Sequence, residues 1–559
     1  MIKDLFLFVC AFAVVNSADW WEKSTLYQIF PRTFKDADND GLGDLKGITS
    51  KLEYLKEIGL TAAWLSPIFK SPQIDAGYDV SDYMDIDPDY GTLEDLKELI
   101  TKAKELEIKI ILDFVPNHTS DKHEWFIKSV NGDQEYADFY IWREGKNNNT
   151  EPPSNWRSYY KGSAWKYNEK RGLWYYHLFT EGQPDLNFRN PKVIEALNNV
   201  MNYWLDFGID GFVVDAVPYL LEEKNFTDEP RSYNPSMGPN DWDYLEHIYT
   251  KDLDETFDVI YQWREVIDKY NNKHGGDSRI MLTVANSTFN NTLRYYGSPD
   301  GKKLGAHFTF NFDFVGLNQD TTAVNIKSTI DQWLNNLPQQ FTHNWVTGNH
   351  DNPRIATRLG KDNVDAINML QAILPGIMVN YNGEEYGMEN GPVTCKQGHD
   401  PQTNRNCSIY DSITRDFERT PMQWDNSLNA GFNEGAEPWL PVSPKYIENN
   451  IKDQSQPGVV SHLNIYKSLQ EMRKKIPADA VIGTTVINNT VLGISRLVHN
   501  GYYLLLYNRL GAPTEVKING ESRVVVSSSN SDKIAGIVIP EKILLGINEC
   551  IIVWQGIPA

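Results

Sequence analysis

The chain has 559 residues, of which 41% are hydrophobic and 12% aromatic, and its formal net charge at pH 7 is −22. This length exceeds a single small domain and accommodates a barrel of about 250 residues together with a second module. The acidic balance argues against a nucleic-acid partner, because phosphate binding needs an excess of Lys and Arg. A neutral or cationic ligand is expected instead.

Residues 1–17, MIKDLFLFVCAFAVVNS, predict a secretory signal peptide. A Lys near the start, an apolar run and a small residue before Ala18 are typical of such a leader, and the run is too short to span a membrane. No later run reaches the length of a transmembrane helix, so no membrane span is expected. The sequence therefore predicts a secreted, extracellular, soluble protein.

The cysteines and sequons agree with an oxidising compartment. Cys395 and Cys407 flank the polar loop KQGHDPQTNRN and are expected to close it with a disulfide, which leaves Cys550 unpaired. Asn117 also begins a sequon, but it ends a strand expected inside the fold, and no glycan is predicted there. N-glycosylation is predicted at the other sequons, Asn148, Asn225, Asn286, Asn290, Asn406 and Asn488.

From residue 25 onward the chain alternates between strand-like and helix-like patterns. A helical stripe of apolar residues covers 45–58, a capping box at Thr92 opens a second helix, and a third is expected at 191–207. Eight strands are predicted, at 25–34, 62–69, 108–118, 209–215, 279–286, 306–314, 343–351 and 376–385. This alternation predicts an α/β fold with a parallel sheet closed into a (β/α)8 TIM barrel.

Two segments depart from this alternation. Residues 119–187 are rich in Trp, Tyr, Asn and Gly and lack helical periodicity, which predicts an inserted subdomain over the barrel mouth after strand three. Residues 480–559 contain short β-branched runs separated by turns and predict a C-terminal antiparallel β domain. The barrel itself is expected to comprise residues 18–118 and 188–479.

Acidic residues recur where predicted strands end. Strand three ends with Asp113 and His118, strand four with Asp215, and strand seven with the run 349–351, Asn-His-Asp. A single Asp after an apolar run is usually a helix cap or a turn residue. Several converging buried carboxylates, however, cost free energy unless they are paired, and a purely structural barrel has no reason to gather them. Because no HxH or HExxH zinc spacing is present, paired carboxylates favour glycoside chemistry.

Six motifs in a fixed order make this chemistry specific. They are DFVPNH (113–118), QPDLN (183–187), GFVVDA (211–216), GNHD (348–351), NYNGEEYGM (380–388) and RTPMQWD (419–425). Together they resemble the signature regions of the α-amylase superfamily, glycoside hydrolase family thirteen, and in particular its α-glucosidase branch with the insect maltases. The resemblance covers about residues 20–559, and it implies a TIM-barrel glycosidase fold.

The resemblance implies roles for the residues at the strand ends. The family's nucleophile falls on Asp215, and its transition-state-stabilising carboxylate falls on Asp351. His118 and His350 match histidines that bind the hydroxyls of the sugar in the cleaved position. Asp113 matches a strand-end acid with a structural role.

A second group of residues implies a blind pocket for one terminal glucose. Asp75 and Tyr78, in DAGYD, match the pair that closes this pocket in exo-acting members, and Arg415, in TRD, matches the arginine opposite Asp75. The implied ligand is a small α-glucoside of maltose or sucrose size, or another glucose-terminated sugar.

The sequence departs from the family at two catalytic positions. Where the family has an Arg two residues before the nucleophile, this chain has Val213, and where it has the general acid Glu on strand five, this chain has Val284. A positioned general acid contributes roughly 10²–10⁴-fold to the rate, and Val has no proton to give. The favoured interpretation is a maltase-like protein that has lost hydrolysis and binds a sugar or a protein partner. The alternative is an active retaining α-glucosidase.

An acidic turn precedes the first helix. Asp36, Asp38, Asp40 and Asp44 alternate as in an EF-hand loop, with Gly41 at the sharp turn and the Leu42 carbonyl as a further oxygen ligand, but the bidentate Glu is absent. A solvated turn without a metal is the other interpretation. Because members of the family hold a structural Ca²⁺ in this loop, the resemblance implies a calcium site. No organic cofactor is expected.

Overall fold

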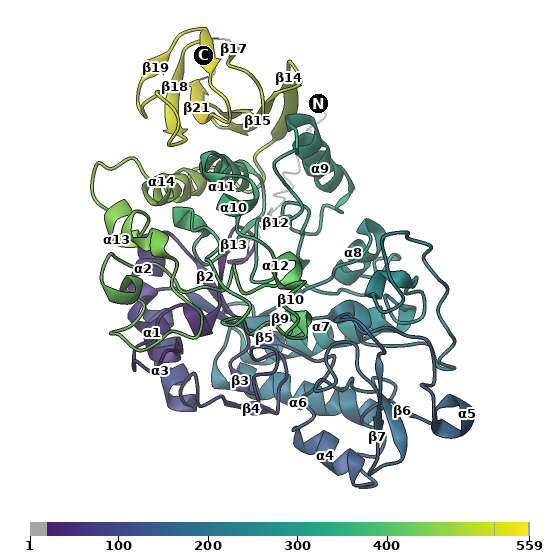
Figure 1. Ribbon diagram of the computed structural model, residues 1–559. Helices are drawn as coiled ribbons and strands as arrows, with labels where there is room; N and C mark the ends of the chain where they lie inside the picture. The colour runs from purple at the N-terminus through teal and green to yellow at the C-terminus, as the bar shows by residue number, and fades with distance from the viewer. Residues whose placement is uncertain (1–18, 519, 557–559) are drawn as a thin grey trace, which may run out of the picture.

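The computed structural model describes residues 19–518 and 520–556, and the predicted signal peptide lies outside them. A barrel of parallel strands occupies the centre of Figure 1, with helices around it, and a separate yellow β domain at the C-terminal end of the chain. Within residues 19–518 and 520–556, no helix combines the length and the apolar character needed to cross a membrane.

Eight parallel strands form the barrel, in agreement with the prediction. Going round it they are β1 (Thr25–Ile29), β2 (Ala62–Leu65), β5 (Lys109–Phe114), β9 (Gly211–Val214), β10 (Ile280–Thr283), β11 (Phe308–Thr309), β12 (Asn344–Val346) and β13 (Ile377–Tyr381). Strand β13 pairs with β1. Hydrogen bonds between Asn311, just after β11, and Asn344 and Val346 of β12 close the barrel on the other side. All eight strands are shorter than predicted, because the chain leaves each ladder before the predicted strand ends.

The helices of the barrel form where their sequence signals occur. Thr92 and Asp95 make the reciprocal bonds of a capping box at the start of α3 (Leu93–Glu105), and α6 (Pro191–Phe207) covers the predicted residues. The stripe at 45–58 is broken at Lys51 into α1 (Leu45–Ser50) and α2 (Leu52–Glu57). The remaining helices of this part are α7 (Asp254–His274), α8 (Phe289–Tyr296), α9 (Ala323–Asn336), α10 (Ile355–Arg358), α11 (Val364–Ile373), α12 (Tyr410–Ile413), α13 (Ile451–Gln454) and α14 (His462–Lys474).

The segment 119–187 contains a small antiparallel sheet of β6 (Trp142–Arg143), β7 (Trp165–Asn168) and β8 (Leu173–Tyr176). It also contains helix α4 (Glu124–Val130), which the lack of periodicity did not predict, and the short turn α5 (Lys146–Asn149). A hairpin of β3 (Phe69–Lys70) and β4 (Asp82–Ile86) follows the second barrel strand. A bridge between residues 118 and 185 attaches the insert to the barrel rim, and a bridge between 140 and 186 lies within the insert.

The last part of the chain is the predicted antiparallel β domain. Its strands are β14 (Ile482–Ile487), β15 (Val491–Val498), β16 (Gly501–Asn508), β17 (Thr514–Lys517), β18 (Ser522–Ser527), β19 (Val538–Ile539), β20 (Lys542–Leu545) and β21 (Cys550–Gly556). Figure 1 shows this domain beside α9, α11 and α14, where β14 and β16 contact the helices. Cys550 is buried and free, and the predicted disulfide joins Cys395 to Cys407.

Candidate active site

A cavity of about 550 Å³ opens at the ends of the barrel strands where the motifs lie. Asp215 follows β9, Val284 follows β10, and His118 follows the loop after β5. His350 and Asp351 follow β12. The structure therefore brings together the residues that the sequence predicts for one site, since parallel strands deliver their carboxyl ends to one face of the barrel.

Arg415 organises one wall of this cavity. It is 7% exposed, and its Nη2 lies 2.9 Å from Asp75 Oδ1 and 2.8 Å from Asp400 Oδ1. Its Nη1 lies 3.1 Å from Asp351 Oδ1. The hydroxyl of Tyr160 donates a 3.0 Å hydrogen bond to Asp75 Oδ2. Because three carboxylates bind the same planar guanidinium, the orientation of each carboxylate side chain is fixed.

Asp351 is held as an anion. In addition to Arg415, the Nη2 of Arg419 donates a 2.7 Å bond to Asp351 Oδ1, and the ring of His350 lies 3.4 Å away. Attraction to these neighbours keeps the pKa of Asp351 well below its usual range despite the opposing effect of burial. Its side chain remains 42% exposed, so it reaches the cavity as an ionised acceptor and not as a proton donor.

The two histidines are neutral and fixed by their partners. The Nε2 of His118 lies 3.0 Å from the carbonyl oxygen of Tyr78 and 3.2 Å from the Gln183 amide, and burial lowers the pKa of His118 to about 4. His350 stacks on the Tyr78 ring at 5.3 Å, and burial lowers its pKa to about 4 as well. Gln28 contacts its Nδ1 at 2.8 Å. Neutral rings suit hydrogen bonds to uncharged hydroxyls.

Asp215 sits at a sharp bend of the chain. Its backbone N–H donates to the Phe114 carbonyl at 2.9 Å, and the next residue, Ala216, has a φ of 54°, which is uncommon for a residue other than Gly. Burial and the negative charge of Asp351 raise the pKa of Asp215 to about 7. A carboxyl group in this condition is only partly ionised at neutral pH.

The two departures from the family lie on either side of Asp215. Val213 is fully buried in β9, opposite Asp113 on β5 and Leu282 on β10. Val284 is half-buried, and its side chain belongs to the cavity wall. Neither side chain carries a charge or a proton that it could donate, and the cavity wall is apolar at Val284.

The carboxylates that line the cavity account for its acid–base capacity. Among the described residues they are Asp75, Asp215, Asp351 and Glu418. Burial raises the pKa of Glu418 to about 8. Its Oε2 accepts a 3.3 Å bond from the Asn390 amide, and its carbonyl accepts one from Tyr381 of β13. Glu418 therefore lies near β13, and none of these four carboxylates follows β10 in the chain.

Several residues of the site lie outside the sequence prediction. Tyr160 comes from the insert, Asp400 from the loop closed by the disulfide, and Arg419 from RTPMQWD. Asp400 also accepts a 2.7 Å bond from the backbone N–H of Arg415. Their partners are far away in the chain, so no local pattern identified them. Asp113 lies behind the cavity wall, where its Oδ2 accepts a 3.0 Å bond from Tyr78.

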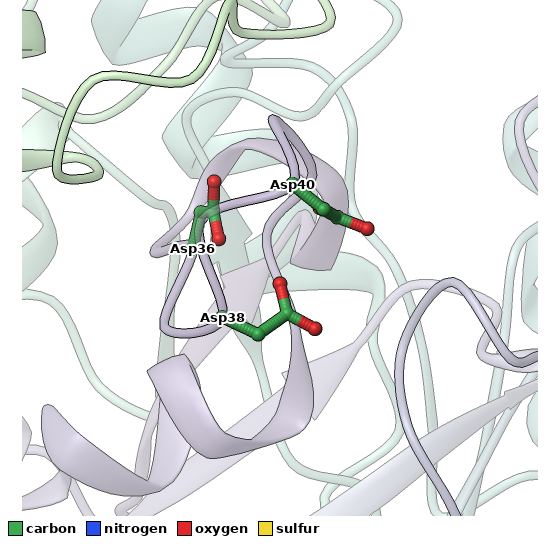
Figure 2. A group of neighbouring side chains, drawn as sticks. All are labelled: Asp36, Asp38 and Asp40. Carbon is green, nitrogen blue, oxygen red and sulfur yellow. The ribbon is translucent and has the colours of Figure 1, made fainter.

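The acidic turn brings three oxygen donors together. Carboxylate oxygens of Asp36, Asp38 and Asp40 lie within 4.8 Å of one another, and Figure 2 shows the three side chains on one turn of the chain. The φ of Gly41 is 101°, as the sharp turn requires. Asp44 instead caps the following helix, since its Oδ1 and Oδ2 accept bonds from the N–H groups of Gly47 and Ala37. Hard carboxylate oxygens in this arrangement fit the chemistry of Ca²⁺.

The predicted glycosylation sites are exposed side chains. Each of the six asparagines has an exposed side chain, whereas Asn117 is 1% exposed and donates a 2.8 Å bond to Asp185. Asn286 differs from the other five because it also lines the cavity.

Comparison with known proteins agrees with this architecture. Residues 28–480 match the family model described as the catalytic domain of alpha amylase. Maltase A1 of Drosophila melanogaster is 44% identical over 94% of both chains, and the salivary alpha-glucosidase of Aedes aegypti is 40% identical over 97% of this chain and 95% of its own. A crystal structure of the alpha-glucosyl transfer enzyme XgtA superposes with a TM-score of 0.86 at 29% identity, covering 96% of this chain and all of the other.

These similarities extend over the barrel, the insert and the C-terminal domain, and they include the strand ends that form the cavity. The chain belongs to the alpha-amylase family, in its branch of insect maltases and alpha-glucosidases.

Proposed function

We propose that this protein is a secreted, maltase-like protein that binds the terminal glucose of a small α-glucoside and has lost the hydrolysis of that bond. The observation that carries this proposal is Val284, which lines the cavity at the family's general-acid position. A sugar leaving as an alkoxide needs a proton, and a positioned acid contributes roughly 10²–10⁴-fold to the rate. A valine side chain supplies none.

The other carboxylates do not replace the missing acid. Asp75 and Asp351 are both engaged in ion pairs with Arg415, and Glu418 lies near Arg419 and accepts a bond from the Asn390 amide. In retaining glycosidases the two carboxyl groups stand about 5 Å apart on either side of the scissile bond. The proposal therefore assigns Asp215 the nucleophile position without a partner on the leaving-group side.

Binding of a sugar is supported by the groups that remain. Asp75, Arg415 and Asp351 form a fixed polar wall, and the neutral rings of His118 and His350 offer donors and acceptors for hydroxyls. The cavity volume of about 550 Å³ suits a sugar of one or two rings. Tyr78 and Phe179 add aromatic surface. We also propose that Asp36, Asp38 and Asp40 hold a structural Ca²⁺ with no part in binding the sugar.

The alternative is an active retaining α-glucosidase, which the identity of 44% to a maltase favours. The two are separated by measuring, on the same secreted protein, maltose hydrolysis and glucose binding by calorimetry. We expect binding without turnover, and loss of binding in Asp75→Asn. Turnover of maltose at rates ordinary for maltases would overturn the proposal. Absence of any sugar binding would leave a protein partner as the ligand.

A further inference from the structure

The loop after β10 carries a sequon at the mouth of the cavity. Asn286, Ser287 and Thr288 form the sequence Asn-Ser-Thr. Its neighbours are anchored: Val284 N–H donates to the Val214 carbonyl at 3.0 Å, Ser287 Oγ donates to Asp252 at 2.8 Å, and the Thr288 hydroxyl caps α8. The Asn286 side chain is exposed and makes no hydrogen bond to any described residue. An anchored loop thus presents one free amide.

Asn286 is part of the wall between two hollows. One is the sugar cavity, and the other is a groove of about 580 Å³ on the outer side of the loop. Phe312 and Gly316 also line both. The groove offers exposed amides, Asn325 and Gln332, beside the aromatic ring of Phe289. Amides with an aromatic face are the groups that receive a sugar ring and its acetamido substituent.

A group attached to Asn286 would cover the part of the cavity nearest to it, so the position of Asn286 relative to the scissile bond matters. In glycosidases the general acid stands beside the departing sugar, and Val284 occupies that position here. Asn286 is two residues further out on the same loop, a span of at most about 7 Å. A group on Asn286 therefore lies where the outer sugars of a glucoside longer than a disaccharide have to pass.

We propose that Asn286 carries an N-linked glycan whose first sugars lie in the outer groove and cover the leaving-group side of the cavity. The cavity then admits a glucoside of one or two sugar units and excludes longer oligosaccharides. The inference rests on the secretion that the proposed function includes. In the secretory pathway the Asn286 Nδ2 forms a bond to the anomeric carbon of a lipid-linked oligosaccharide, displaces its diphosphate and releases one proton.

The neighbouring sequon provides a matched control. Asn290 is exposed, begins the sequence Asn-Asn-Thr and lies in the first turn of α8, four residues further on. It lines neither the cavity nor the groove. Replacing Asn290 removes a glycosylation site from the same region of the surface without changing access to the cavity.

The test uses the full-length protein secreted by insect cells. Glycopeptide mass spectrometry is expected to find Asn286 occupied. Calorimetry with glucose and maltotriose is then compared for the wild type, Asn286→Gln and Asn290→Gln. We expect Asn286→Gln to bind maltotriose at least tenfold more tightly while glucose affinity changes less than twofold, and Asn290→Gln to change neither. Enzymatic trimming of the wild-type glycans should reproduce the Asn286→Gln result.

An unmodified Asn286, or equal maltotriose affinity in the wild type and Asn286→Gln, overturns the inference. Failure of all three proteins to bind either sugar overturns it too. That last outcome also overturns the proposed sugar binding, whereas the first two outcomes leave the proposed function standing. If Asn286→Gln hydrolyses maltotriose, the glycan covers a working active site, and the proposed loss of hydrolysis is wrong while the inference stands.

Discussion

Val213 lies directly opposite Asp113 in the register of the neighbouring barrel strands β9 and β5. Side chains two residues apart in a strand share one face, so Val213 also belongs to the face of Asp215. Burial and the charge of Asp215 raise the pKa of Asp113 well above its usual range. Asp113 and Asp215 are thus close to each other at the barrel mouth. Val213, which lies beside both, is apolar and supplies no positive charge to either carboxyl group.

This arrangement makes stability depend on pH in a definite direction. The folded state holds the proton on Asp215 up to about pH 7, whereas the unfolded state releases it near the ordinary pKa of 3.8. The folded state therefore binds more protons between these values, and the free energy of unfolding falls as pH rises from about 4 to about 7. We expect Asp215→Asn, which stays neutral, to gain stability over the wild type across this window.

Melting temperatures of the wild type and Asp215→Asn at pH 4, 5, 6, 7 and 8 measure this effect. The difference is expected to be near zero at pH 4 and to reach an effect on the order of a few kcal/mol at pH 8. Melting curves that differ by the same amount at every pH would show that Asp215 titrates normally.

A cation at position 213 is expected to reverse the shift. In Val213→Arg, the guanidinium lies beside Asp113 and Asp215 and favours their ionised forms, because an opposite charge within about 4–6 Å lowers the pKa of a carboxyl group. The same series of melting temperatures should then lose its decline between pH 4 and 7. Val213→Leu is the control for the added volume, and it should retain the decline.

The disulfide loop is expected to support sugar binding through Asp400. Asp400 bonds both the backbone N–H and the guanidinium of Arg415, which is 8% exposed at its side chain. Replacing one member of a buried ion pair leaves the other charge less compensated. We expect Asp400→Asn to weaken glucose binding about tenfold, a loss of about 1.4 kcal/mol.

Calorimetry with glucose checks this prediction, and Asp411→Asn, an exposed acid in the same segment, is the matched control. Cys395→Ser with Cys407→Ser should act in the same direction as Asp400→Asn, because it releases the loop. Unchanged glucose affinity in Asp400→Asn would mean that Arg415 is held in place by Asp75 and Asp351 alone.

Calcium is expected to stabilise the fold without affecting the cavity. Removing the ion with EGTA should lower the melting temperature, since a ligand present at 100 times its Kd adds about 2.7 kcal/mol to the free energy of unfolding. Asp38→Asn changes an exposed donor of the acidic turn and should melt at the same temperature with and without EGTA. Identical melting of the wild type in both conditions would contradict a bound ion, and glucose affinity serves as the internal control.

The sequence predicted the barrel because its signals are local. Apolar runs, the capping box at Thr92 and the Pro and Gly that bound α6 depend on neighbours within a few residues, and the structure confirms them. Helix α4 was missed because its short run lies among aromatic residues that obscure helical periodicity. The predicted strands ended too late, because the sequence alone does not show where the hydrogen bonds between neighbouring strands end.

The site was predictable where a motif carries its residues, either at a strand end or, for Asp75, Tyr78 and Arg415, in a loop. Asp215 and Asp351 follow strands, and the resemblance assigns them roles. Tyr160, Asp400 and Arg419 contact the residues of the cavity wall across long stretches of chain, such as the 85 residues between Tyr160 and Asp75. The fold brings such residues together, and no periodic pattern in the sequence predicts these contacts.

The most direct test of the proposed loss of hydrolysis is a paired assay of maltose cleavage by the wild type and by the double variant Val213→Arg with Val284→Glu. The account predicts background activity for the wild type and at least about a 10²-fold increase in the variant, because the variant regains a general acid and a cation beside Asp215. Wild-type hydrolysis at the rate of an ordinary maltase, with no gain in the double variant, would contradict it.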